Sequence, residues 1–170
     1  DKELKQGTDP KQIAYIAFSN IAANVAKERI KNDNVYVSTM HSMGTRESGI
    51  NTKTQLLTGD KWKSFKNFSQ ICANLNFEQR LTVTGHVEHQ NPHMRIIELA
   101  RNKKIKIEEA ALELGLQYTT DIWLTEQIAE DLKTYKESTG MVEFSDMISK
   151  FVEEDRCPPL QCVFLDEAQD

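Results

Sequence analysis

The chain alternates short apolar runs with longer amphipathic segments. Residues 13–18 form a continuous apolar run, which is typical of a buried strand in a parallel sheet. Ser19 follows as a candidate N-cap for a helix over 20–31, and a second short apolar run covers 35–37. Because a strand, a helix and a strand follow one another closely here, we predict a right-handed βαβ unit.

From about Gly44 the segments become shorter, more polar and mostly helical. The apolar spacing predicts helices over 92–102, 107–114 and 122–138, and it favours a brief strand at 82–84. Another amphipathic helix is predicted around 144–151, before two consecutive prolines end the helical section. This middle part has the character of a helical insertion into an α/β domain.

The last apolar run, Cys162–Leu165, leads directly into Asp166 and Glu167. It is typical of a buried parallel strand, and ligands of open α/β sheets bind beyond the carboxyl ends of such strands. One carboxylate at that point can hold Mg²⁺, and the next can orient the water that attacks a γ-phosphate. The pattern therefore predicts a nucleotide-hydrolysing site, with a surface cluster of acids as the alternative.

Charge and cysteine content narrow the function classes. A net charge of −5 at pH 7 argues against a surface that binds nucleic acid everywhere, but it leaves a local groove possible. No apolar run approaches the ~20 residues that a membrane span needs. Three cysteines without C-x-x-C spacing indicate neither a disulfide framework nor a zinc site. We expect a cytoplasmic protein that does not enter a membrane.

Four segments, in order, resemble motifs of superfamily 1 DNA helicases of the UvrD/Rep type. The family forms are T-F-T-N-K-A-A followed by E-R-I, then T-F-H-S, D-F-x-D-L and motif II, or Walker B. The matching segments are Ala17–Ala23 with Glu28–Ile30, Thr39–Ser42, Phe144–Ile148 and Asp166–Asp170. The chain departs from the family at Ile21, where lysine is usual, and at Met40, where an aromatic residue is usual.

The resemblance implies an α/β fold, a partial RecA-like (P-loop NTPase) parallel sheet domain with a mostly helical inserted subdomain. Residues 1–43 and 140–170 would form the ATPase core, and 44–139 would form the insertion. The implied function is an ATP-dependent DNA helicase or translocase of DNA repair or replication, which couples Mg-ATP hydrolysis to movement on single-stranded DNA near a duplex junction.

The phosphate-binding sequence G-x-x-x-x-G-K-[ST] does not occur in the 170 residues. Residues 1–6 have the pattern of a helix tail, so we expect the chain to begin just after the P-loop. By the resemblance, it would depend on the remainder of its own polypeptide, including a second motor domain. We therefore expect the isolated chain to be inactive towards ATP.

By the resemblance, the acids after the last strand have distinct roles. Asp166 would coordinate Mg²⁺, and Glu167 would polarise the attacking water. Gln169 would sense the γ-phosphate, and Asp170 would support the nucleotide-binding loop by hydrogen bonding.

The resemblance also places single-stranded DNA along the first two strands. Phe18, Ser19 and Asn20 would contact it by packing and by hydrogen bonds to phosphate. The remaining members of the same groove would be Thr39, His41 and Ser42. For Phe18 the alternative is core packing, and for Ser19 it is helix capping.

A plain DNA-binding module is the alternative function. Residues 108–116 look like the first helix and turn of a helix-turn-helix, but the helix from Ile122 carries acids that suit a phosphate-lined groove poorly. An RNA helicase of the DEAD-box kind is disfavoured, because that family continues its acid pair with Ala-Asp or Ala-His. 

Two further clusters admit a functional interpretation. Trp62, Phe65 and Phe68 alternate with lysines, which suits either core packing or contact with duplex DNA, and we favour the core. Three histidines lie at 86, 89 and 93, but Pro92 interrupts any helix that would align them, so we do not predict a metal site.

Overall fold

The computed structural model describes residues 7–77, 79–81 and 87–167. The chain divides into two compact units. The first unit contains Asp1–Thr52 and Asp146–Asp170, and the second contains Lys53–Ser145. The expected helix tail at residues 1–6 and the expected strand at 82–84 lie outside the described residues.

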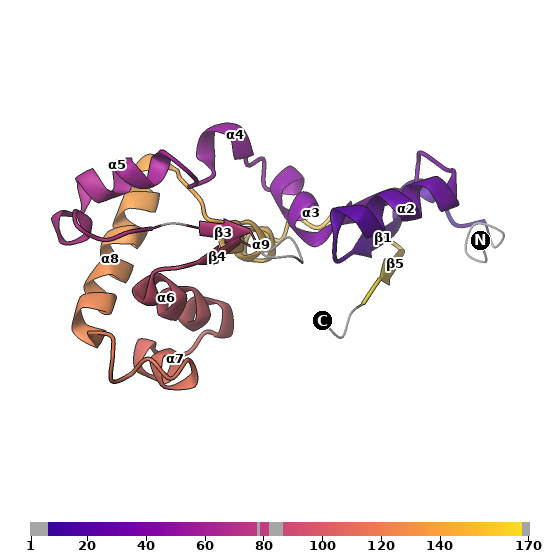
Figure 1. Cartoon of the computed structure of the whole chain (residues 1–170). Helices are drawn as coiled ribbons and strands as arrows, with labels where there is room; N and C mark the ends of the chain where they lie inside the picture. Colours follow the sequence, from indigo (N-terminus) through magenta and orange to yellow (C-terminus); the bar gives the residue numbers. More distant parts are fainter. Residues whose placement is uncertain (1–6, 78, 82–86, 168–170) are drawn as a thin grey trace. The chain divides into compact units, whose positions relative to one another are not determined.

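The first unit is built on a three-stranded parallel sheet (Figure 1). Its strands are β1 (Ile13–Ala17), β2 (Tyr36–Thr39) and β5 (Cys162–Leu165), in the order β2-β1-β5. Both pairings of β1 are parallel. The predicted α/β fold class is confirmed, since this parallel sheet is combined with helices in one chain.

The helix α2 (Asn20–Ile30) connects β1 to β2 and contacts both strands. It begins where the side chain of Ser19 accepts a hydrogen bond from the backbone N–H of Ala22 over 3.2 Å. Ala23 and Ala26 are its buried residues, and their small side chains let the helix lie close to the sheet. The predicted strand-helix-strand unit is therefore confirmed, with parallel strands.

On the other face of β1 lie α3 (Met40–Glu47) and α9 (Phe144–Glu153). Ala14 and Ile16 pack there against Met43 of α3 and Phe151 of α9.

Gly44, where the sequence suggested that an insertion begins, lies inside α3. A Cβ atom at Gly44 would lie 2.9 Å from the carbonyl oxygen of Met147, so glycine allows α3 to approach α9 this closely. The boundary between the two compact units falls later in the sequence, between Thr52 and Lys53.

The second unit is mostly helical. Its helices are α5 (Lys61–Phe68), α6 (Pro92–Lys103), α7 (Ile107–Glu113) and α8 (Ile122–Thr139), and the short helix α4 (Thr52–Gln55) leads into it. The helices predicted over 92–102, 107–114 and 122–138 are confirmed to within two residues at each end. The strands β3 (Gln79–Leu81) and β4 (Val87–His89) form a short antiparallel ribbon that was not predicted. Two 3₁₀ turns complete the described elements, η1 (Pro10–Gln12) in the first unit and η2 (Gln70–Cys72) in the second.

Aromatic residues dominate the core of the second unit. Trp62 and Phe65 are buried, and the Trp62 ring stacks on that of Phe77 with 5.4 Å between centroids. Phe68, on the next turn of α5, is largely exposed and touches the ring of Tyr135. For Trp62 and Phe65, the interpretation as core residues is confirmed.

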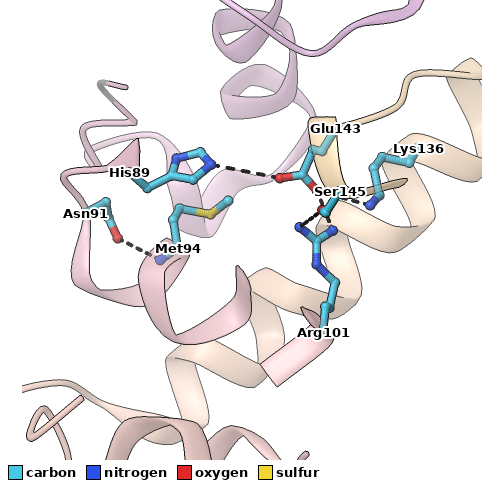
Figure 2. Close-up of polar contacts among 7 residues, drawn as sticks. All are labelled: His89, Asn91, Met94, Arg101, Lys136, Glu143 and Ser145. Carbon is cyan, nitrogen blue, oxygen red and sulfur yellow. Dashed lines mark hydrogen bonds and ion pairs between the residues drawn. The ribbon is translucent and has the colours of Figure 1, made fainter. Parts of the chain in front are cut away.

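A buried carboxylate joins three elements of this unit (Figure 2). Glu143 accepts hydrogen bonds from Arg101 of α6 and from Lys136 of α8, the latter over 3.0 Å. Nε2 of His89, at the end of β4, lies 3.9 Å from the other carboxylate oxygen. Burial alone would raise the pKa of Glu143, but the two cations outweigh it and hold the pKa below its usual value.

Candidate functional site

Three segments of the chain meet at the carboxyl edge of the parallel sheet. Ala17, the last residue of β1, pairs with Thr39, the last residue of β2. On the other side of β1, Ile16 pairs with Leu165, and the backbone N–H of Asp166 donates to the carbonyl oxygen of Ile16 over 2.9 Å. The segments that follow the three strands therefore lie along one edge, with the β1 segment in the middle.

The acids after β5 occupy one end of this edge. Asp166 is half-buried and Glu167 is exposed. The backbone of Glu167 has a φ of 53°, in the left-handed region that residues other than glycine rarely adopt. That conformation costs a residue other than glycine about 1–2 kcal/mol. Gln169 and Asp170, to which the resemblance gives nucleotide-binding roles, lie outside the described residues.

The donor set at this edge has the chemistry of a magnesium site that depends on substrate phosphates. Mg²⁺ is usually held by one or two carboxylates together with waters and phosphate oxygens. Asp166 and Glu167 can supply such carboxylate oxygens. Among the described residues there is no cluster of three or more histidine, cysteine or acidic side chains that would hold a metal ion by itself. Carboxylate oxygens of this kind are suited to hold Mg²⁺ beside the phosphates of a nucleotide.

The hydroxyls of Ser19 and Thr39 fix the starts of two helices at the same edge. Ser19 caps α2, as described above. Thr39 is buried, and its Oγ1 accepts from the N–H of Ser42 over 3.2 Å and donates to Ser42 Oγ over 3.0 Å. Both side chains thus cap the helices that follow them, and the amino ends of α2 and α3 lie at the carboxyl edge of the sheet. The first N–H groups of a helix favour anions such as phosphate.

The other residues with expected DNA contacts are more accessible. Phe18 is 44% exposed, although most phenylalanines are buried. Asn20 and Ser42 are exposed, and His41 is half-buried. Ile21, where the family usually has lysine, is 78% exposed on the first turn of α2. An accessible row of one aromatic ring and several small polar side chains therefore follows β1 and β2.

Tyr15 is a neighbour of this edge that the sequence did not single out. It lies in β1 and lines a hollow of about 580 Å³ together with Phe164 and Asp166. Burial raises the pKa of Tyr15, and so does the nearby Asp166. The only signal in the sequence is a hydroxyl-bearing side chain within an otherwise apolar strand.

The helix-turn-helix alternative receives little support from the second unit. α7 ends at Glu113 and α8 begins at Ile122, so the intervening loop covers 114–121. A helix-turn-helix has a turn of about 3–4 residues. The loop here is longer, and the first two turns of α8 present an exposed Trp123 together with Glu126.

The histidines of the second unit have structural contacts. Nδ1 of His93 lies 2.7 Å from Oγ1 of Thr125, in a buried hydrogen bond. His89 lies beside Glu143, and His86 is outside the described residues. Since burial lowers the pKa of both His89 and His93, the two rings are neutral near pH 7.

None of the helices within 7–77 and 87–167 combines the length and the apolar character required to cross a membrane.

The chain matches the model of a known protein family. A search among curated proteins found no match. The family model of the UvrD/REP helicase N-terminal domain matches residues 2–170, which include both compact units and the carboxyl edge of the sheet. The chain therefore belongs to the UvrD/REP helicase N-terminal domain family.

Proposed function

We propose that this chain is the part of an ATP-dependent DNA helicase or translocase in which nucleotide and single-stranded DNA meet. The observation that supports it most is the register of the sheet, which brings Asp166 to the same edge as the starts of α2 and α3. In this proposal the first unit is a partial RecA-like ATPase core, and the second is the inserted subdomain.

The proposed nucleotide site uses the acids after β5. Asp166 holds Mg²⁺, which neutralises charge on the phosphates when it is bound. Glu167 orients the water that attacks the γ-phosphate and takes up its proton. Gln169 contacts the γ-phosphate, and Asp170 supports the loop. The exposure of Glu167 is consistent with a role in contact with substrate and solvent.

The proposed DNA site follows β1 and β2. Phe18 packs against a base, while Asn20 and Ser42 donate hydrogen bonds to phosphates at the amino ends of the two helices. Ser19 and Thr39 hold those helix ends in place through their capping bonds. His41, between the exposed positions, lines the same groove. One edge would then carry nucleotide at one end and DNA at the other.

The proposed partners follow from this arrangement. They are ATP with Mg²⁺, single-stranded DNA near a duplex junction, and the remaining motor domain of the polypeptide. The proposed location is the cytoplasm.

Steady-state ATP hydrolysis by the natural polypeptide that contains these residues tests the proposal. We expect single-stranded DNA to stimulate hydrolysis and Glu167→Gln to lower kcat by about 10²–10⁴-fold, as for loss of a general base. Glu113→Gln is the matched control, because Glu113 is an exposed acid of the second unit. Unchanged hydrolysis in Glu167→Gln would remove the proposed catalytic role of Glu167. DNA binding without any hydrolysis in the wild type would favour a non-enzymatic DNA-binding module instead.

A further inference from the structure

Tyr15 and Asp166 share one face of the parallel sheet. Tyr15 in β1 pairs with Phe164 in β5, and paired residues of neighbouring strands point to the same side. Asp166 follows Phe164 by two positions, so its side chain continues on that side. Its backbone is held there by the hydrogen bond to Ile16. Tyr15 and Asp166 are thus diagonal neighbours, at a separation that an aromatic side chain can span.

Both residues line the hollow beside α2. Tyr15, Phe164 and Asp166 all line this space of about 580 Å³. Apart from Asp166 itself, the described lining residues carry only two polar side chains, Tyr15 and Arg29. The Tyr15 hydroxyl is therefore one of only two side-chain donors in the hollow that can serve the Asp166 carboxylate.

The chemistry of the pair is complementary. An ionised carboxylate can only accept hydrogen bonds, whereas a phenol that keeps its proton can donate one. The pKa of a tyrosine phenol is ordinarily about 10, so Tyr15 keeps its proton at neutral pH and remains a donor.

We propose that Tyr15 is a positioning residue whose hydroxyl donates a hydrogen bond to Asp166 and holds this carboxylate in one orientation at the end of β5. The inference rests on the proposed function, in which Asp166 holds Mg²⁺. One carboxylate oxygen can accept from Tyr15, and the other would remain available to hold Mg²⁺. Removing a partner that orients a metal ligand typically lowers metal affinity or activity about 10–100-fold.

Tyr15→Phe isolates the hydroxyl, because it keeps the ring that fills the hollow. The matched control is Tyr36→Phe on the neighbouring strand, where the ring lies 3.9 Å from the guanidinium carbon of Arg46. Two quantities are measured in the natural polypeptide. They are the dissociation constant of Mn²⁺ in the presence of ADP, by electron paramagnetic resonance, and the Mg²⁺ concentration for half-maximal ATP hydrolysis.

We expect Tyr15→Phe to raise both quantities about 10-fold or more, with kcat at saturating Mg²⁺ little changed, and Tyr36→Phe to match the wild type. If Tyr15→Phe equals the wild type in both, the positioning role is overturned and the proposed function stands. If the wild type itself binds no Mn²⁺ with ADP, the proposed function fails, and the inference fails with it.

A second measurement does not need a variant at Tyr15 or a metal. The 170-residue chain contains four tyrosines, and labelling their Cζ atoms with ¹³C gives one NMR signal for each. Asp166→Asn should move one of these signals, because one phenol loses its anionic acceptor. Asp60→Asn, in the second unit, is the control and should move none. Four unchanged signals in Asp166→Asn would overturn the inference.

Discussion

Arg101 and Glu143, 42 positions apart in the sequence, form a hydrogen-bonded ion pair inside the second unit. Glu143 is only 5% exposed, and Lys136 donates a second hydrogen bond to the same carboxylate oxygen. The carboxylate thereby links α6, α8 and the segment that leads into α9 (Figure 2). A buried carboxylate is tolerated only because these cations compensate for its lost hydration.

Removing this carboxylate charge should destabilise the fold. We expect Glu143→Gln to lower the free energy of unfolding by about 3 kcal/mol, because Arg101 and Lys136 lose their anionic partner. The control is Glu113→Gln, whose ion pair with Lys103 is about half exposed on both sides and contributes less than about 1 kcal/mol. Urea unfolding followed by circular dichroism measures both. Equal effects of the two variants would contradict the buried role of Glu143.

Acid should weaken the fold in two steps. Since burial lowers the pKa of His89 and His93, the unfolded chain binds protons first as the pH falls below about 6.5, and the free energy of unfolding decreases. The carboxylates facing these rings, Glu143 and Asp121, oppose this shift without reversing it. The contribution of Glu143 is complete above about pH 4.3 and is lost as the pH falls through its lower folded-state pKa.

Urea midpoints between pH 7.5 and 3.5 measure both steps. We expect His93→Gln to reduce the first step, because one of the two buried rings no longer titrates, and to leave the second step in place. A first step of unchanged size in this variant would show that His93 does not contribute to it.

Gly44→Ala should be destabilising although Gly44 lies in a helix. Alanine in an exposed helix normally stabilises by about 0.5–1 kcal/mol relative to glycine. Here the new Cβ would lie 2.9 Å from the Met147 carbonyl oxygen and 3.4 Å from the Phe151 Cβ, so α3 and α9 must separate. We expect a net loss of about 1–3 kcal/mol in thermal or urea unfolding. An increase in stability would mean that α3 and α9 do not pack this closely.

Phe18→Ala should weaken binding of single-stranded DNA. Loss of one base-stacking side chain costs about 1–3 kcal/mol, which corresponds to a decrease in affinity of about 5-fold to 150-fold. Phe68→Ala is a matched control, because Phe68 is 46% exposed and Phe18 is 44% exposed. Fluorescence anisotropy with a labelled oligonucleotide gives both affinities. Equal losses for the two variants would remove the proposed DNA contact at Phe18.

Local sequence signals predicted much of the fold. β1 was predictable because its residues form a continuous apolar run, as a strand buried on both faces requires. Helix ends were predictable where a single residue caps the helix through its side chain or its backbone conformation. Ser19 and Asn91 cap helices through their side chains, and Gly140 ends α8 with a φ of 69°.

Features that depend on distant residues were not predictable in this way. Each strand of the β3-β4 ribbon has three residues, too few to show a period. Glu143 gives no sign in the sequence that it meets Arg101, because that contact depends on how α6 packs. The acids after β5 were predicted as a site from the strand before them. That Asp166 lies near Tyr15 follows only from the register of the sheet.

Strand separation driven by ATP tests the central claim most directly. The substrate is a duplex with a single-stranded tail, and the natural polypeptide that contains these residues is compared with its Glu167→Gln variant. We predict that the wild type separates the strands only with ATP and Mg²⁺, and that the variant binds DNA and nucleotide but separates strands at least about 100-fold more slowly. Strand separation by the variant at the wild-type rate would contradict the assignment of the catalytic chemistry to this edge of the sheet.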